Sequence, residues 1–265
     1  MKILVTFALE NEFASWRAKH DFRVSEWGGM GVHVADIGGA EVGVILSGAG
    51  PKHAAHAAGT VMRAEGDSIG LCISSGLAGA LRTDYSIGQI LAANAVVPEN
   101  PGAGSESGAI PASGALISFA VECGATAAGR FYTAERVVSR AEEKRLLGRT
   151  ADAVEMESFE IMSAAADSGI PAVAIRAISD SVDEDMPIDM TDIFTDEGQI
   201  SMPRVLAQAA KNPQSIAGLM RLGRNSKVAA EAIAGFLDHY VSMVAARMSG
   251  LEQNAAAAGR QGSQA

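Results

Sequence analysis

Three acidic residues stand where predicted apolar β-strands end. Glu12 follows the first of these strands, Glu157 a later one and Asp180 the last. The apolar runs concerned are residues 2–9, 153–157 and 173–180. In open α/β sheets, ligands bind outside the carboxyl ends of the strands, so these acids could converge on one pocket. Carboxylates without metal-ligand spacing suit acid/base chemistry on a polar substrate that carries hydroxyl groups.

Each of these acids also has an ordinary structural explanation. Glu12 lies on a predicted first helical turn, where a glutamate complements the helix dipole. Asp180 could cap a helix or close an Asx-turn, and the sequence favours this as much as catalysis. Glu155 and Glu157 flank Met156 and share a side of an extended strand unless the helix begins at once. A dipole role explains one glutamate but not two, so we predict function for Glu157 and leave Glu155 open.

The composition excludes several classes of function. The chain has 265 residues, 21 of them Lys or Arg and 31 Asp or Glu, which gives a net charge of −10. A nucleic-acid partner is not expected, because phosphate contacts need basic patches. The first apolar run is too short to span a membrane and is not followed by a signal-peptide cleavage pattern. We therefore expect a cytoplasmic protein without a transmembrane segment.

Apolar runs alternate with helical patterns along most of the chain, which predicts an α/β fold with a mostly parallel sheet. The predicted strands are residues 2–7, 31–37, 41–46, 69–74, 90–97, 130–133, 151–155 and 172–178. The predicted helices are residues 12–20, 51–65, 112–123, 140–147, 157–168, 203–222 and 225–248. Gly38-Gly39 predicts a hairpin turn, so the sheet should be mixed. We expect a single domain over residues 1–248, a surface loop at 100–114 and a disordered tail at 249–265.

Two glycine-rich turns follow predicted strands, at residues 46–51 and 74–80. Backbone can approach a ligand closely at such turns, and the helix after the first could receive an anion. Neither turn matches a P-loop or the full dinucleotide fingerprint, so we expect no nucleotide cofactor. His53 and His56 are three residues apart on a predicted helix, but the sequence offers no further ligands at matching positions, so we expect no metal.

Taken together, these segments resemble the nucleoside phosphorylase/nucleosidase superfamily, most closely its methylthioadenosine/S-adenosylhomocysteine nucleosidase branch. The segments that carry the resemblance are Glu12 with its strand, Ser47-Gly-Ala-Gly50, Ser75-Gly-Leu-Ala-Gly79, Val154-Glu-Met-Glu157 and Arg176-Ala-Ile-Ser-Asp180. Residues 133–138, 142–144 and 199–237 also resemble a hopanoid-associated phosphorylase-like subfamily. The resemblance implies a three-layer α/β fold, in which helices flank a central mixed, twisted β-sheet, and a homodimer.

The resemblance further implies cleavage of the N-glycosidic bond of a purine nucleoside. Asp180 would protonate the purine at N7, which requires a carboxyl group that holds a proton near neutral pH. Glu12 would hold and deprotonate the attacking water. Glu157 would bind the ribose hydroxyls beside Met156, with Glu155 assisting. The other substrate contacts that the resemblance implies are Val137, Val138, Ser179, Ala49, Leu77, Ala78 and Gly79. Core packing explains the two valines equally well.

The sequence departs from the true purine phosphorylases at the second glycine turn. In those enzymes a basic and a hydroxyl residue hold phosphate there, whereas the corresponding places here are Ser74 and Leu77. Water is therefore the expected nucleophile, although Lys52, His53 or a neighbouring subunit could still recruit phosphate. The substrate that we expect is a 5′-modified adenosine. Two alternatives stay open: an adenosylated hopanoid precursor as the substrate, or a nucleoside-binding module without catalysis.

Overall fold

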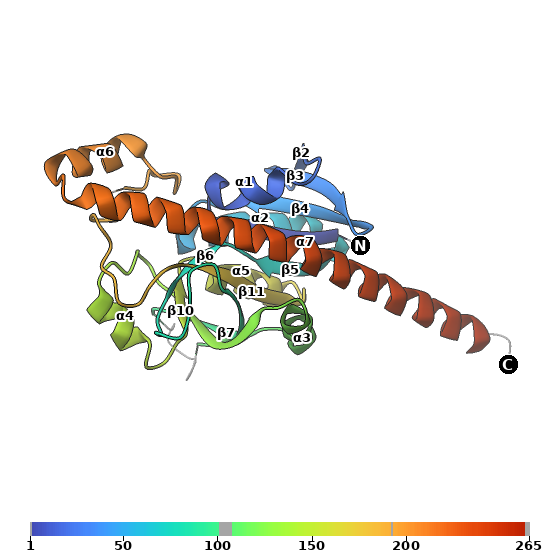
Figure 1. Cartoon of the computed structure of the whole chain (residues 1–265). Coiled ribbons are helices and arrows are strands. Elements are labelled where there is room, and N and C mark those ends of the chain that lie inside the picture. Colours follow the sequence, from blue (N-terminus) through green and yellow to red (C-terminus); the bar gives the residue numbers. More distant parts are fainter. Residues whose placement is uncertain (1, 101–107, 192, 263–265) are drawn as a thin grey trace.

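The computed structural model describes residues 2–100, 108–191 and 193–262, which form a mixed sheet covered by helices on both faces (Figure 1). The strands are β1 (Lys2–Phe7), β2 (Arg23–Trp27), β3 (Met30–Ile37), β4 (Ala40–Leu46), β5 (Ile69–Ser74), β6 (Leu77–Ala80), β7 (Ile90–Pro98), β8 (Ile110–Pro111), β9 (Thr126–Thr133), β10 (Ala153–Glu155) and β11 (Ala172–Asp180). The helices are α1 (Glu10–Arg17), α2 (Pro51–Glu65), the 3₁₀ turn η1 (Gly66–Ser68), α3 (Gly114–Glu122), α4 (Ala141–Leu147), α5 (Ser158–Asp167), α6 (Met202–Lys211) and α7 (Ser215–Gly262).

The sheet runs in the order β2-β3-β4-β1-β5-β11-β6-β10-β9-β7-β8. Strands β4, β1, β5 and β11 are mutually parallel, whereas β3 is antiparallel to β4, as the predicted hairpin requires. Strand β7 also pairs with β11, so β11, β6, β10, β9 and β7 close into a ring. The parallel strands bring their carboxyl ends to one edge, where a site is expected.

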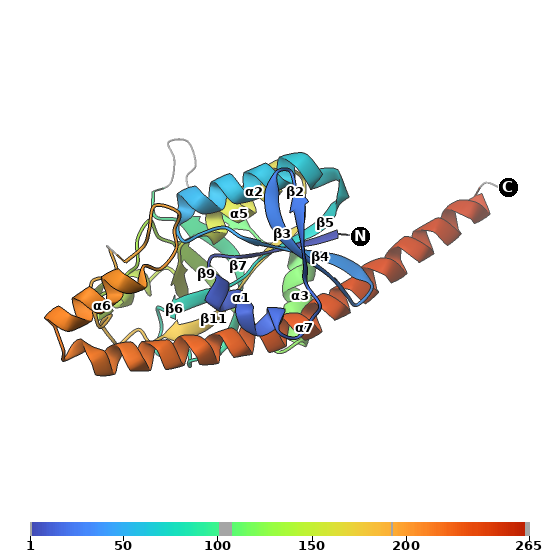
Figure 2. The same cartoon turned by 90° about the horizontal axis from the view of Figure 1, so that it is seen from above.

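Alternation along β1 explains why helices cover both faces. Ile3, Val5 and Phe7 pack with α1, α3 and α7, whereas Leu4 faces the apolar side chains of α2 and α5. Successive side chains of a strand point to opposite faces, so an uninterrupted apolar strand needs two covering layers. Figure 2 shows α2 and α5 on one side of the sheet and α7 on the other. The predicted three-layer α/β fold with a mixed sheet is confirmed.

The prediction missed three strands and misplaced the break between the last two helices. Strands β2, β6 and β8 have no apolar alternation, and β6 lies inside the second glycine-rich turn. The predicted break at residues 223–224 is wrong, because Gly223 and Arg224 lie within α7. The chain instead leaves the helix around Asn212, ahead of Pro213, because proline disfavours a helical conformation in the residue before it.

The structure differs from the sequence prediction at the C-terminal tail. Residues 249–262 are helical, where we predicted a disordered tail from 249 to 265. The division into one domain and a tail stays a prediction. Of the predicted loop at residues 100–114, residues 101–107 lie outside the described residues.

Helix α7 is the one described helix that is long and apolar enough to cross a membrane by length and composition. The segment concerned is Ser215–Met248, and 56% of its most apolar window is buried inside the molecule. Ala229, Ile233, Leu237 and Tyr240 pack in the core against α1 and the sheet. This burial is what a core helix of a folded domain requires, and the expected absence of a transmembrane segment stays a prediction.

Candidate active site

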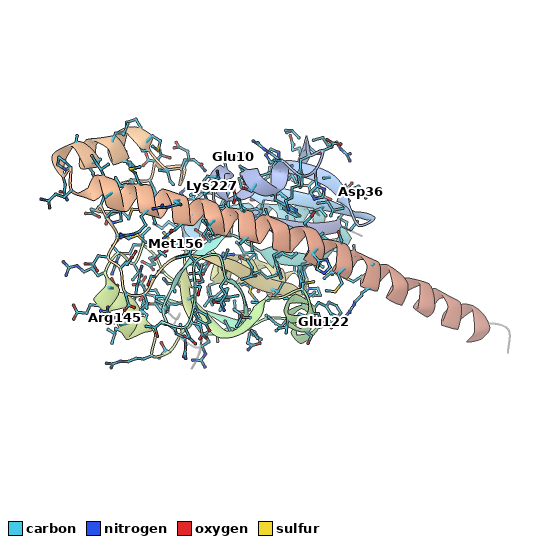
Figure 3. All side chains as sticks on the ribbon, in the orientation of Figure 1. Glu10, Asp36, Glu122, Arg145, Met156 and Lys227 are labelled. Atoms are coloured by element: carbon cyan, nitrogen blue, oxygen red, sulfur yellow. The ribbon has the colours of Figure 1, made fainter. Side chains whose placement is uncertain are left out.

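All the site residues predicted from the sequence line one cavity of about 230 Å³. These residues are Glu12, Ala49, Leu77, Ala78, Gly79, Val137, Val138, Glu155, Met156, Glu157, Ser179 and Asp180. The cavity lies beside β6, at the carboxyl ends of β1, β10 and β11, and is completed by the loops before α2 and after β9. Met156, which lines this cavity, is labelled in Figure 3. The tertiary structure therefore brings the three predicted acids together.

Backbone donors hold the Glu12 carboxylate in place. Its Oε2 atom accepts hydrogen bonds from the backbone N–H groups of Ala8 (3.0 Å) and Leu9 (3.1 Å), and its Oε1 from that of Leu77 (3.1 Å). A carboxylate has about four acceptor positions, so one remains for a ligand or water. Burial raises the pKa of the Glu12 carboxyl, opposed by attraction to Arg176 and by the three backbone bonds. A raised pKa makes the ionised form a stronger base.

The Glu157 carboxyl lies across the cavity and is partly paired. Its Oε1 atom accepts a hydrogen bond from the backbone N–H of Gly50 (2.8 Å), and its Oε2 lies 3.9 Å from Arg176 Nη2. Gly50 has φ of 98°, a conformation that glycine adopts at little cost. Burial, followed by repulsion from Glu155, raises the pKa of Glu157 to about 8. At neutral pH this carboxyl can therefore donate as well as accept hydrogen bonds.

Glu155 supports its neighbours. Its Oε2 atom accepts from Arg176 Nη2 (2.7 Å) and from the backbone N–H groups of Glu157 (3.0 Å) and Ser158 (2.7 Å), and its Oε1 from the Thr133 hydroxyl. These bonds fix the start of α5 and hence the Glu157 backbone. They favour a positioning role over the substrate contact predicted for Glu155.

Asp180 ends β11 with both carboxylate oxygens engaged. Its Oδ2 atom accepts from the Ser179 hydroxyl (2.9 Å), and its Oδ1 from Lys144 Nζ. Among the described residues, no backbone N–H bonds this carboxylate, so the Asx-turn explanation does not hold. Gly79 leaves room for it, since a Cβ there would lie 2.8 Å from Oδ1. The carboxylate therefore faces the cavity between a hydroxyl and an ammonium group.

Sequence reasoning missed Lys144 and Arg176. Lys144 lies on α4 with 1% of its side chain exposed, and its Nζ atom also donates to the carbonyls of Ser181 (3.0 Å) and Glu184 (3.3 Å). Nothing in the helical pattern of residues 140–147 distinguishes it from an exposed lysine. Arg176 gives a clearer signal, because an arginine inside an apolar strand needs a buried carboxylate partner.

The cavity has few basic groups that could bind an anion such as phosphate. Of the described residues that line it, Arg136 alone is basic, and that guanidinium is half exposed and bound to Glu143 (2.6 Å). Lys52 and His53 line a neighbouring cavity that shares Ala49 and Met156 with this one. Within residues 2–100, 108–191 and 193–262, no group of three or more His, Cys, Asp or Glu side chains could hold a metal ion.

The family model of the phosphorylase superfamily matches residues 2–216 of the sequence. The chain belongs to the phosphorylase superfamily. The resemblance on the five sequence segments is thereby confirmed at the level of the superfamily, and all five segments supply residues that line the cavity. The further resemblance to the hopanoid-associated subfamily stays a prediction.

Solved structures of this superfamily fold match the chain over most of its length. A Helicobacter pylori 5′-methylthioadenosine/S-adenosyl homocysteine nucleosidase is 22% identical, with a TM-score of 0.71 over 92% of this chain and 98% of that one. The native H. pylori futalosine hydrolase is 21% identical, with the same TM-score and coverage. The nucleosidase from S. pneumoniae is 18% identical, with a TM-score of 0.68 over 91% and 99%. No curated protein matches the sequence significantly.

Proposed function

We propose that this member of the phosphorylase superfamily hydrolyses the N-glycosidic bond of a purine nucleoside. The substrate would be a 5′-modified adenosine of the methylthioadenosine or S-adenosylhomocysteine type, and the products would be adenine and the free sugar. The observation that carries the proposal is the convergence of Glu12, Glu157 and Asp180 on one cavity. The names of the similar nucleosidase structures are consistent with it.

The three acids divide the chemistry between them. Asp180 would pass a proton to purine N7 and make the base a better leaving group, and the Lys144 ammonium group, which donates to the Asp180 carboxylate, would supply that proton. Glu12 would use its remaining acceptor position to hold and deprotonate the attacking water. Glu157 would donate to and accept from the ribose hydroxyls. The negative charge of the ionised Glu12 would stabilise the cation that develops on the sugar as the bond breaks.

The other lining residues would shape the pocket around the nucleoside. Met156 would pack against the sugar, and Val137 and Val138 against the base. Val138 also belongs to a small apolar cluster with Leu81 and Val154, so packing and base contact are compatible at that position. The backbone of Ala49, Leu77, Ala78 and Gly79 would approach the ligand closely at the two glycine-rich turns.

Water is the proposed nucleophile because the cavity has little to hold phosphate. Its basic lining residue, Arg136, is already bound to Glu143, and Lys52 and His53 lie in the neighbouring cavity. Adenine release should therefore proceed at the same rate in phosphate and in a non-coordinating buffer. A strict phosphate requirement would show that the protein is a phosphorylase.

A second cavity favours an alternative substrate with a large apolar 5′ group, such as an adenosylated hopanoid precursor. This cavity, of about 400 Å³, is lined mainly by apolar side chains of α6, α7 and the segment before α6. It shares Asn11, Met190, Ile200, Leu222 and Ser226 with the acid-lined cavity. A ribose bound at Glu157 could extend its 5′ substituent in this direction, and water or phosphate could serve as the nucleophile.

Adenine release from a series of 5′-substituted adenosines, with and without phosphate, tests these alternatives. The principal proposal expects turnover of methylthioadenosine or S-adenosylhomocysteine, and the second expects turnover only when the 5′ group is long and apolar. No adenine from any substrate would favour a nucleoside-binding module. Such a module would have no need of an acid placed to protonate the base.

A further inference from the structure

We propose that one end of the molecule docks on the surface of an anionic lipid bilayer. The docking surface comprises α6, the connection after it and the first turns of α7, residues 200–228, and is called the elbow below. Figure 1 shows the elbow at the end of the molecule opposite the C-terminus. Its charge and its exposed apolar side chains both point to this partner.

The elbow is basic in an acidic protein. Residues 199–230 contain five basic residues and no Asp or Glu, namely Arg204, Lys211, Arg221, Arg224 and Lys227. The rest of the chain keeps 16 of the 21 basic residues and all 31 acidic ones. Clusters of Lys and Arg at a membrane surface are attracted to anionic lipid headgroups. The charge of the elbow is therefore opposite to that of the molecule and complementary to an anionic membrane.

Neighbouring carboxylates neutralise only part of this charge. Arg221 pairs with Glu184 at 3.3 Å and Lys227 with Glu231 at 3.8 Å. Within the described residues, no carboxylate lies at ion-pair distance from Lys211 or Arg224. An acidic segment, residues 183–197, precedes the elbow in the sequence. Because dissolved ions screen exposed charges, we expect the attraction of the elbow to an anionic bilayer to weaken as the salt concentration rises.

Large apolar side chains of the elbow are exposed on both helices. Met202 and Leu206 are 57% and 63% exposed on α6, and Ile216 and Met220 are 48% and 72% exposed on α7. Each pair is spaced by four residues, so its members lie on one helix face. On α7, Arg224 and Lys227 continue the face of Ile216 and Met220, and Lys227 is labelled in Figure 3. An amphipathic helix with basic and apolar residues together is suited to the membrane interface.

A lipid surface fits the elbow better than a second copy of this chain does. In a twofold dimer the same patch is used on both subunits, so the basic charge of one elbow would face that of the other. Such a like-charge contact disfavours the pairing, whereas a bilayer accepts apolar and basic groups at once. Met202 also lines the second cavity, so docking would place that cavity beside the lipid.

Vesicle co-sedimentation of the full chain tests the proposal without requiring catalytic activity. We expect binding to vesicles of phosphatidylglycerol and phosphatidylcholine at low salt, much weaker binding to phosphatidylcholine alone, and release by 0.5 M salt. The variant M202S/L206S/I216S/M220S and the variant K211E/R224E should each bind at least tenfold less. All six side chains are exposed, so both variants should fold, which far-UV circular dichroism would verify.

Matched controls change the same residue types elsewhere on the surface. The variant V24S/L146S removes two apolar side chains that are 78% and 59% exposed, and R23E/R149E reverses two exposed charges. These controls should bind like the unchanged protein. The proposal is overturned if anionic vesicles bind no protein, if both elbow variants bind as well as the controls, or if the elbow variants instead convert a dimer to a monomer in light scattering. Because adenine release is not measured, failure here is distinct from failure of the proposed hydrolysis.

Discussion

Replacing Lys144 by methionine tests the buried ion pair that holds Asp180. The Lys144 side chain is 1% exposed and that of Asp180 12% exposed, so the pair lies almost wholly out of water. Removal of one partner from a buried pair leaves the other charge uncompensated, which costs about 3–5 kcal/mol. Methionine keeps most of the volume of the lysine stem, so a cavity contributes little. We expect Lys144→Met to lower the free energy of unfolding by an amount in this range.

Two further variants separate the charge effect from the loss of packing. Asp180→Asn leaves the Lys144 ammonium group with the carbonyls of Ser181 and Glu184, so its loss of stability should be smaller. The double variant removes both charges and should be more stable than Lys144→Met alone, because no unpaired carboxylate remains. Together with the unchanged protein, the three variants complete a double-mutant cycle whose interaction energy has a predicted sign.

Urea unfolding at pH 7, followed by the fluorescence of the buried Trp16 and Trp27, gives the free energies by linear extrapolation. The slopes of the curves should agree among variants, since the surface exposed on unfolding is the same. Two results would refute the reasoning. One is a loss below about 1 kcal/mol for Lys144→Met, against the 3–5 kcal/mol of a buried pair, and the other is strictly additive losses in the double variant.

Three further predictions concern the other acids and one glycine. Folding raises the pKa of Glu157 from 4.5 to about 8, so Glu157 loses its proton in the unfolded chain first as the pH rises. The free energy of unfolding should therefore fall between pH 4.5 and pH 8, by up to about 1.4 kcal/mol per pH unit. Glu157→Gln should remove this fall in the urea midpoint measured at pH 5, 6.5 and 8. A midpoint that still falls as steeply with pH in this variant would show that Glu157 is not its cause. Glu12→Gln should lower adenine release by several orders of magnitude, whereas Glu10→Gln on the same helical turn should not; equal rates for both variants would remove Glu12 from the mechanism. Gly76→Ala should lower the free energy of unfolding by about 1–3 kcal/mol, because φ at Gly76 is +141°. It should also slow turnover, because the new Cβ would lie 3.2 Å from Glu12 Oε1. Gly29 also has a positive φ, but a Cβ there would meet no other atom, so Gly29→Ala serves as the control. Both variants should unfold at a lower temperature, whereas only Gly76→Ala should release adenine more slowly.

Local pattern was sufficient to predict most of the elements. Strands β1 and β5 and helix α2 have the predicted bounds, because their apolar runs or helical pattern are bounded by turn residues. The glycine hairpin between β3 and β4 was equally readable, since Gly38 and Gly39 adopt the positive φ that this turn requires. Strand β6 was not readable, because its partners β10 and β11 lie far along the chain, and β2 was not readable because only its last residue, Trp27, is buried.

The sequence by itself determined which residues could do chemistry and at which strand ends they stand. Glu12, Glu157 and Asp180 follow apolar runs, and a parallel sheet brings such ends to one edge. Only the tertiary structure decided how each acid is held. The pairing of Asp180 with Lys144 joins residues 36 positions apart, and the one between Glu155 and Arg176 joins residues 21 apart. Burial and charge partners of this kind depend on the packing of separate elements, which periodicity along the chain does not encode.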